Sequence, residues 1–328
     1  MKDWLEARWY RTAPPPLLLR PFAALYGRLS AARRRKARPQ GLPVPVPVVV
    51  VGNISVGGTG KTPFTIWLVG QLRLLGWKPG VISRGYGGRA PRYPHVVAVD
   101  GDAAHSGDEP LLIARRCGCP VVVAPDRHAA ALRLLEGGDV DIIVADDGLQ
   151  HYALARDLEI CIVDGARGLG NEALLPAGPL REPVARLRDV DLIVVNGGTW
   201  CPAGLASVRM QLQAEHALPL RDGRPRALSE FAGQRVHAVA GIGHPPRFFS
   251  MLRGHGIDVI EHAFADHHPY QAGDLQFGDR LPLLMTEKDA VKCSALDLTD
   301  AWFVPVTAQL PAADAAHVQE LLKSLRKP

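Results

Sequence analysis

The segment Ser55–Thr62 has the residue types and the spacing that hold the phosphates of a nucleotide. It reads Ser-Val-Gly-Gly-Thr-Gly-Lys-Thr and is separated by three residues from Val48–Val51, a β-branched apolar run that is typical of a buried strand. A loop between a strand and a helix can turn backbone N–H groups and the positive end of the helix dipole toward phosphate oxygens. The predicted nucleotide contacts are Ser55, Val56, Gly57, Gly58, Thr59, Gly60, Lys61 and Thr62.

Two side chains of this loop carry its chemistry. Lys61 would neutralise the β- and γ-phosphates of ATP, and the Thr62 hydroxyl would ligate Mg²⁺. Ser55 stands where the usual G-x-x-x-x-G-K-[ST] pattern begins with glycine, but the other glycines of the loop keep its backbone freedom. We therefore expect a P-loop that uses ATP and Mg²⁺ for phosphoryl transfer.

Carboxylates at a second strand end are candidates for the metal. The apolar run Ile142–Ala145 is followed by Asp146 and Asp147, where an aspartate that holds Mg²⁺ through its water shell is expected. Two solvated aspartates in a turn would have the same sequence. In a proline-rich loop further on, Arg181 could stabilise phosphoryl charge and Glu182 could lie near the metal, although a surface ion pair would look the same.

A possible general base lies at the start of another helix. Asp108 follows Gly107 there, where an acidic residue also serves as ordinary capping and dipole compensation. Far along the chain, Asp266-His267-His268 could be an acid/base or metal cluster. Adjacent histidines on a loop rarely ligate one ion, so this cluster is weak evidence by itself.

The elements that position these residues alternate between strands and helices. Continuous apolar strands separated by helices predict an α/β fold with a P-loop NTPase-like, mostly parallel sheet that has helices on both faces. We expect helices at 62–75, 109–116 and 127–135 and strands at 48–51, 81–82, 96–99, 121–124, 142–145, 160–163 and 192–195.

A change of pattern near residues 221–230 predicts a domain boundary. We divide the chain into an N-terminal amphipathic segment (1–40), a P-loop domain (41–225) and a smaller α/β domain (226–328) that closes over the nucleotide site. The expected strands of the smaller domain are 236–240, 259–260, 283–285 and 303–306, and its last helix, 313–325, could pack back on the P-loop domain.

The first 40 residues differ from the rest in charge. They hold ten Lys/Arg against two acidic residues, a balance of +8, whereas the whole chain of 328 residues carries +5, so the remainder carries −3. Apolar residues recur at helical spacing from Leu17 to Leu29 and are followed by Arg33–Lys36, a pattern that favours an anionic membrane surface as partner. The alternative is a helix packed on the protein's own core with a solvated basic end.

Other partners and compartments are disfavoured by composition. Because the positive charge lies at one end of the chain, it does not indicate a protein that coats nucleic acid. No apolar run is long enough to span a bilayer, and no signal peptide is recognisable, so we expect the chain to stay in the cytoplasm. The five cysteines form no C-x-x-C pair, which argues against structural zinc and fits a reducing compartment.

Taken together, these segments resemble the tetraacyldisaccharide 4'-kinases, the lipid A 4'-kinases of Gram-negative bacteria. The resemblance extends from about residue 50 to 292. Its matching segments are Gly52–Pro63, Ser83–Tyr86, Gly107–Pro110, Asp146–His151, Leu175–Glu182 and Thr286–Val291.

This resemblance implies transfer of the γ-phosphate of ATP to the 4'-hydroxyl of an acylated glucosamine disaccharide 1-phosphate. The reaction would take place on the cytoplasmic face of the inner membrane, and we expect a monomer. Asp108 would act as the base on the attacking hydroxyl, assisted by His267 from the second domain, with His268 as an ambiguity. The matched positions also keep Lys61 and Arg181 among the catalytic candidates and Thr62, Asp146, Asp147 and Glu182 among the metal candidates.

Two rival classes fit the sequence less well. A membrane-associated ATPase switch typically has a lysine just before the double glycine, where this chain has Val56. A regulatory GTPase would read guanine with a lysine two positions before an aspartate, whereas Lys288 and Asp289 are adjacent.

Overall fold

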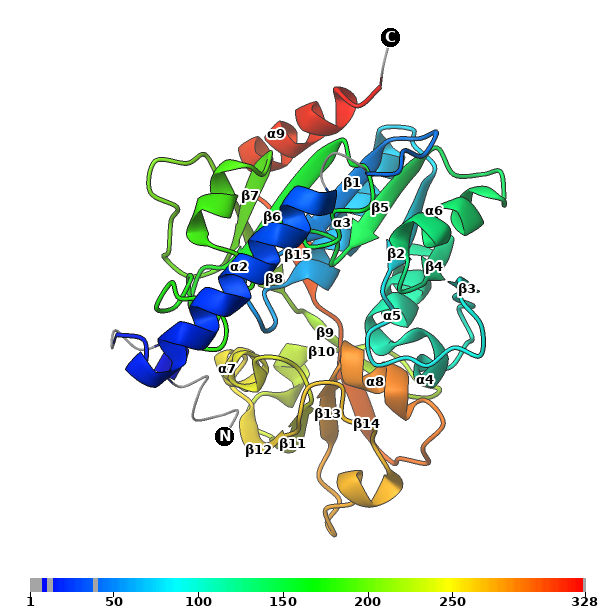
Figure 1. Ribbon diagram of the computed structural model, residues 1–328. Helices are drawn as coiled ribbons and strands as arrows, with labels where there is room; N and C mark the ends of the chain where they lie inside the picture. The colour runs from blue at the N-terminus through cyan, green and yellow to red at the C-terminus, as the bar shows by residue number, and fades with distance from the viewer. Residues whose placement is uncertain (1–7, 11–13, 38–40, 327–328) are drawn as a thin grey trace.

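The computed structural model describes residues 8–10, 14–37 and 41–326, and two β-sheets form its framework (Figure 1). In the larger sheet all neighbouring strands run parallel except the two edge pairs β3/β4 and β15/β8. In spatial order its nine strands are β15 (Thr307–Gln309), β8 (Val208–Gln213), β7 (Leu192–Asn196), β6 (Leu158–Asp164), β1 (Val48–Gly52), β5 (Ile142–Asp146), β2 (Pro79–Ser83), β4 (Val121–Val123) and β3 (His95–Val96).

Helices cover both faces of this larger sheet, and its central strands β1, β5, β6 and β7 are buried along their whole length. On β1, Val49 and Val51 pack in one core while Val48 and Val50 pack in the other, as the two-residue period of a strand requires. The first core includes α3 (Lys61–Leu74), α5 (Asp108–Cys117) and α9 (Ala312–Lys323), and the second includes α6 (Arg127–Leu135). The predicted fold class is confirmed.

The smaller sheet has six strands and its own two cores. Strands β12, β11, β13 and β14 are parallel, while β9 is antiparallel to β14 and to β10. One core contains α7 (Pro245–Gly254) and the other contains α8 (Glu287–Cys293). The order is β10 (Arg226–Ala227), β9 (His216–Pro219), β14 (Ala301–Val304), β13 (Leu283–Thr286), β11 (Arg235–Ala240) and β12 (Asp258–Ala263).

The chain crosses between the two sheets twice, from β8 to β9 and from β14 back to β15. The pattern change at 221–230 begins after β9 and includes β10, so it falls inside the smaller sheet, and the division into domains stays a prediction. Helix α9 packs on the larger sheet, and Gln319 Nε2 of α9 donates to Gln71 Oε1 of α3 at 2.7 Å.

Some predicted strand ranges are wrong, and some strands were not predicted. Residues 96–99 hold only the end of β3, and β14 ends at Val304, before Pro305. Strands β8, β9 and β15 escaped prediction because they are short and partly exposed, and their mixed polar sequences lack a continuous apolar run.

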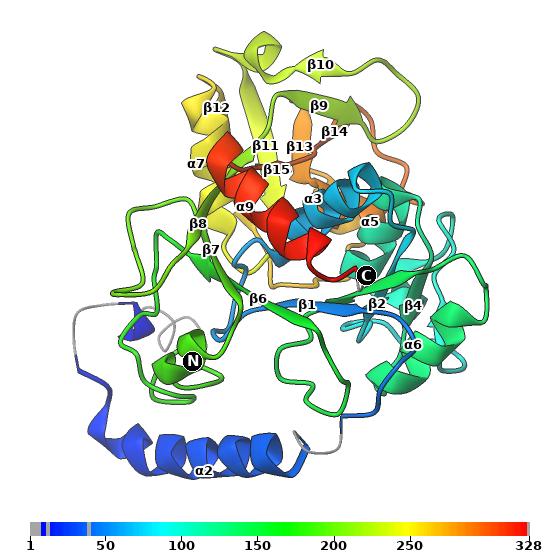
Figure 2. The ribbon, with the colours of Figure 1, turned by 90° about the horizontal axis from the view of Figure 1, so that it is seen from above.

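The N-terminal elements lie at the outer edge of the molecule, away from both sheets (Figure 2). They are η1 (Leu17–Leu19) and α2 (Arg20–Ala37). Arg34 Nη2 of α2 pairs with Asp189 at 2.7 Å, yet Leu18 and Phe22 are 87% and 61% exposed. A helix packed on the protein's core would bury these side chains, so their exposure disfavours that alternative. Within the described residues, no helix is both long and apolar enough to cross a membrane.

The remaining short elements are one α-helix and three 3₁₀ turns: α4 (Ala103–Ser106), η3 (Val184–Arg188), η4 (Leu228–Phe231) and η5 (Ala272–Leu275).

Candidate active site

The P-loop lies between β1 and α3, and two neighbouring asparagine side chains hold its conformation. Gly57 and Gly60 have φ values of 98° and 96°, which non-glycine residues rarely adopt. A Cβ at Gly60 would collide with the side-chain amide of Asn196. That amide donates from Nδ2 to Thr59 O at 2.9 Å, and Asn53 Nδ2 donates to Thr59 Oγ1 at 3.3 Å. The loop is therefore held in one conformation by side chains outside it.

Asp147 forms ion pairs with Lys61 and Arg181, the two cations that are predicted to contact the phosphates. Lys61 Nζ lies 3.4 Å from Asp147 Oδ1, and Arg181 Nη1 lies 3.4 Å from Oδ2. Burial opposes ionisation of Asp147, but Lys61 and Arg181 outweigh it and lower its pKa to about 2. Asp147 also has φ 51°, a left-handed conformation that non-glycine residues keep only where their surroundings hold them.

Asp146 is the buried partner at the end of β5. Thr65 Oγ1 donates to Asp146 Oδ1 at 3.2 Å, and Ser83 Oγ donates to Oδ2 at 3.5 Å. Burial, followed by the charges of Glu109 and Asp147, raises its pKa to about 7. A bound divalent cation would oppose this shift, because it favours the ionised carboxylate.

The donor set at this strand end fits Mg²⁺. Thr62, Asp146 and Asp147 offer only oxygen, the ligand type that Mg²⁺ prefers. Asp147 Oδ1 is buried, and among the described residues it has the ion pair with Lys61 but no hydrogen bond of good geometry. Over the same residues, no group of three His, Cys, Asp or Glu converges into a metal cage. Mg²⁺ that keeps waters and binds phosphates needs no such cage.

Arg181 reaches the site because its loop pairs with the P-loop backbone. Arg181 N donates to Ile54 O at 2.7 Å, and Val56 N donates to Pro179 O at 2.9 Å. These two backbone hydrogen bonds join the loops and place the Arg181 guanidinium beside Asp147.

Glu182 is held by two hydrogen-bond donors and one ion pair. Tyr152 donates its hydroxyl to Oε1, Gln150 Nε2 donates to Oε2 at 3.0 Å, and Arg186 Nε lies 3.7 Å from Oε2. Gln150 also donates to Asn53 O at 2.9 Å, which ties Glu182 to the strand end before the P-loop. A metal contact for Glu182 would have to compete with these bonds and stays a prediction.

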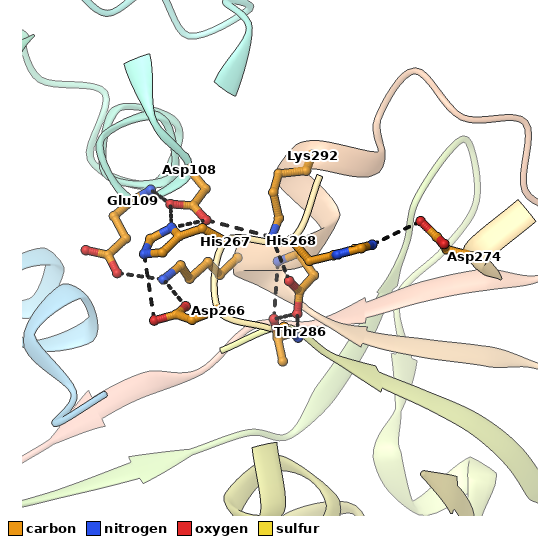
Figure 3. Close-up of polar contacts among 11 residues, drawn as sticks. Asp108, Glu109, Asp266, His267, His268, Asp274, Thr286 and Lys292 are labelled. Atoms are coloured by element: carbon orange, nitrogen blue, oxygen red, sulfur yellow. Dashed lines mark hydrogen bonds and ion pairs between the residues drawn. The ribbon is translucent and has the colours of Figure 1, made fainter. Parts of the chain in front are cut away.

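Asp108 and His267 meet across the two sheets (Figure 3). Asp108 begins α5, and His267 lies on the loop 264–282 between β12 and β13. His267 Nδ1 lies 3.0 Å and 2.9 Å from the two carboxylate oxygens of Asp108. His268 points away and pairs through Nε2 with Asp274 at 3.0 Å. Of the two adjacent histidines, it is therefore His267 that contacts the Asp108 carboxylate.

The electrostatic surroundings keep Asp108 ionised. Burial opposes the charge, but the hydrogen bond with His267 and the nearby Lys288 and Lys292 outweigh burial and hold its pKa below the ordinary value. Lys292 Nζ lies 3.8 Å from Asp108 Oδ2. An ionised carboxylate only accepts hydrogen bonds, so Nδ1 of His267 carries the proton between them. His267 itself has φ 63°, a second left-handed residue in this site.

The smaller sheet also reaches the P-loop directly. A Cβ at Gly243, in the loop after β11, would lie 2.5 Å from Gly58 N. Arg247 of α7 pairs with Asp164 at 2.7 Å, and Arg167 joins that carboxylate at 2.9 Å while donating to Gly58 O at 3.0 Å. The position of the smaller sheet is therefore linked to the P-loop as well as to Asp108.

Sequence reasoning missed several of these residues. Asn196 and Asp164 each end an apolar strand, which is a usable signal because the carboxyl ends of parallel strands meet at one edge. Lys288 was noted only as part of the segment Thr286–Val291, Lys292 was not singled out, and no local pattern indicated their contacts.

A phosphate loop that stands with a carboxylate–imidazole pair can move a phosphoryl group to a hydroxyl, so fold and site define a P-loop phosphotransferase. The family model described as Tetraacyldisaccharide-1-P 4'-kinase matches residues 16–326. The chain belongs to this family, and it is a kinase that phosphorylates a hydroxyl group. The resemblance stated from its motifs is confirmed, and the switch and GTPase alternatives are not favoured.

Individual relatives agree over nearly the whole chain. The tetraacyldisaccharide 4'-kinase of Aeromonas hydrophila is 54% identical and covers 94% of this chain and 93% of its own. That of Alkalilimnicola ehrlichii is 52% identical, with coverage of 98% and 97%. The crystal structure of LpxK from Aquifex aeolicus in complex with ATP is 28% identical, covers 94% of this chain and 98% of its own, and has a TM-score of 0.74.

Proposed function

We propose that this protein transfers the γ-phosphate of ATP to the 4'-hydroxyl of tetraacyldisaccharide 1-phosphate, with Asp108 as the general base. The observation that carries the proposal is the contact of His267 with Asp108 on a P-loop fold. Family membership supports the lipid acceptor, and the ATP complex of LpxK from Aquifex aeolicus supports the donor.

A direct assay tests this reaction. Purified protein is incubated with γ-labelled ATP and tetraacyldisaccharide 1-phosphate, and a labelled lipid is expected. The matched control is the same lipid without its 4'-hydroxyl, which should stay unlabelled. Label found only in free phosphate or in the protein would contradict the proposal.

The P-loop side of the site would bind the donor. Backbone N–H groups of residues 57–62 face the phosphates, Lys61 neutralises the β- and γ-phosphates, and Arg181 stabilises charge on the transferred group. Thr62, Asp146 and Asp147 would hold Mg²⁺, which would supply positive charge that offsets the charge of the phosphates. Lys61 and Arg181 exchange their contacts with Asp147 for contacts with phosphate oxygens.

The opposite side of the site would activate the acceptor. Asp108 takes the proton of the 4'-hydroxyl while the oxygen of that hydroxyl bonds to the γ-phosphorus. The bond between the γ-phosphorus and the oxygen of the β-phosphate breaks, which leaves ADP. His267 Nδ1–H fixes the orientation of the carboxylate. All these groups belong to one chain, so we propose a monomer as the working unit.

The pH dependence of turnover is expected to report the Asp108–His267 contact. Because the pKa of Asp108 lies below its ordinary value, the base stays ionised through mildly acidic pH in the native protein. In His267→Ala, the hydrogen bond that lowers this pKa is lost while burial still raises it, so the acid limb of kcat/KM should move to higher pH. The measurement is the ratio of variant to native kcat/KM against pH, in which the titration of ATP cancels. A flat ratio would contradict this account.

We also propose that α2 binds the cytoplasmic face of the inner membrane at its anionic surface. Leu19, Phe22, Leu25, Tyr26, Leu29 and Pro176 line one groove, and the basic run Arg33–Lys36 ends the same helix. Apolar side chains and adjacent cations together hold a helix in the headgroup region. No contact with nucleic acid is proposed, since the basic charge is confined to this segment.

Exchange of three exposed residues tests this membrane contact. Leu18→Ser, Phe22→Ser and Leu25→Ser combined should weaken sedimentation with phosphatidylglycerol vesicles by at least about tenfold, since each buried side chain contributes about 1.5–3 kcal/mol. Leu74→Ser and Leu132→Ser, which alter exposed leucines on other helices, are the matched control. Equal vesicle binding by the triple variant and this control would refute the assignment.

A further inference from the structure

Lys288 is a largely buried lysine that contacts a helix packed on the larger sheet and a loop that belongs to the smaller one. It lies at the start of α8, and its Nζ is 2.7 Å from Glu109 Oε1 of α5 and 3.1 Å from Asp266 Oδ1 of the loop 264–282. Its side chain is only 14% exposed. Burial opposes its charge, but the carboxylates of Glu109, Asp108 and Asp266 outweigh burial and raise its pKa. Lys288 is therefore a fixed cation between two elements that are distant in sequence.

Lys288 joins α5 to the loop 264–282, and each of these carries one residue of the Asp108–His267 pair. Glu109 follows Asp108, and Asp266 precedes His267. His267 Nε2 lies 3.7 Å from Asp266 Oδ2, so the imidazole has a carboxylate near each ring nitrogen. Figure 3 shows Glu109, Asp108, His267 and Asp266 grouped at the start of α5. The position of Asp266 therefore affects the orientation of the His267 imidazole.

We propose that Lys288 is a positioning residue that seats His267 on Asp108 by holding Glu109 and Asp266 together. This inference rests on the proposed function of Asp108 and His267. Without the cation, Glu109 and Asp266 would repel one another, and His267 would lose the support that holds it in its left-handed conformation. The packing of the smaller sheet's loop on α5 would then no longer bring the His267 imidazole to the Asp108 carboxylate.

A second ion pair between the same helices supplies a matched control. Arg116 Nη1 of α5 lies 2.7 Å from Glu287 Oε2 of α8, with side chains 24% and 12% exposed. Within the described residues, no hydrogen bond or ion pair joins this pair to Asp266 or His267. It joins α5 to α8 as Lys288 does, but it lacks the link to the imidazole.

The test compares Lys288→Met with Arg116→Met in the full-length protein. For Lys288→Met we expect kcat to fall at least about tenfold, with the KM for ATP changed less than about twofold, because the P-loop contacts are untouched. Arg116→Met should keep kcat within about threefold of the native value. Lys288→Arg, which keeps the charge, should recover part of the loss.

Two further readouts separate positioning from a general structural role. In a His267→Ala background, Lys288→Met should cause little additional loss, since residues that act as one unit are not additive. The ¹⁵N resonances of the His267 ring should shift in Lys288→Met and stay in place in Arg116→Met. Asp266→Asn, which keeps the side-chain volume, carries the same expectations if Lys288→Met does not fold.

The outcomes that overturn the inference are distinct from failure of the proposed function. Equal losses in Lys288→Met and Arg116→Met, or a full additional loss in the His267→Ala background, would make Lys288 an ordinary interface contact. Native kcat in His267→Ala would instead remove His267 from the reaction. Unlabelled lipid with the native protein would remove the kinase reaction itself.

Discussion

Asp108→Asn is expected to lower kcat by about 10²–10⁴-fold, the range that a positioned general base contributes. The amide cannot take the proton of the 4'-hydroxyl, whereas the P-loop that binds ATP is unchanged. We therefore expect the KM for ATP and the binding of ATP to stay near native values. Steady-state kinetics with the lipid acceptor, together with ATP titration, measure the two effects separately.

Asp102→Asn is the matched control for Asp108→Asn. Asp102 caps the short helix α4 by accepting a hydrogen bond from Ala104 N at 2.8 Å, and it is exposed. Asparagine caps a helix about as well as aspartate, so this exchange removes an exposed carboxylate on the preceding helix and should leave both stability and kcat close to native. If Asp108→Asn alters only Tm or only KM, then Asp108 is a helix-start residue without a role in proton transfer.

Lys61→Met should reduce kcat by about 10²–10³-fold or more, because it removes a cation aimed at charge that develops on the phosphates. Its ionic contact with Asp147 would be lost as well, so the pKa of Asp147 should rise from its depressed value of about 2. The fold should persist, since only the start of α3 is changed. Kinetics and the far-ultraviolet circular dichroism spectrum of the variant test these statements.

The control for this variant is Lys78→Met, which alters an exposed lysine in the turn before β2. It should turn over at the native rate. Near-native turnover of Lys61→Met would exclude the P-loop as the site of phosphoryl transfer.

Local patterns were sufficient for the parts of the site that are continuous in sequence. The P-loop was evident because a buried strand, a glycine-rich turn and a helix start follow one another within Val48–Thr62, and each has its own residue preference. Asp146 and Asp147 were evident for the same reason, as carboxylates directly after an apolar strand. The basic, apolar N-terminus was likewise recognisable from charge and spacing.

Contacts between distant residues were decided by the tertiary structure. Asp108 and His267 are 159 residues apart. The sequence around Asp108 also fits an ordinary helix start, and the sequence around His267 also fits an ordinary loop, so neither one predicts their contact. Which of two adjacent histidines faces the carboxylate depends on the left-handed backbone at His267 and on the pairing of His268 with Asp274.

The sequence by itself determined that this protein holds nucleotide phosphates, that its family is a lipid kinase family, and that its N-terminus is basic and apolar. Only the tertiary structure decided which side chains meet, such as Lys288 with Glu109 and Asp266, and Asn196 with the P-loop. The physical reason is that residue preferences act over one turn or one strand. Side-chain neighbours depend instead on strand order and on how the two sheets pack, and both come from burial summed over the whole chain.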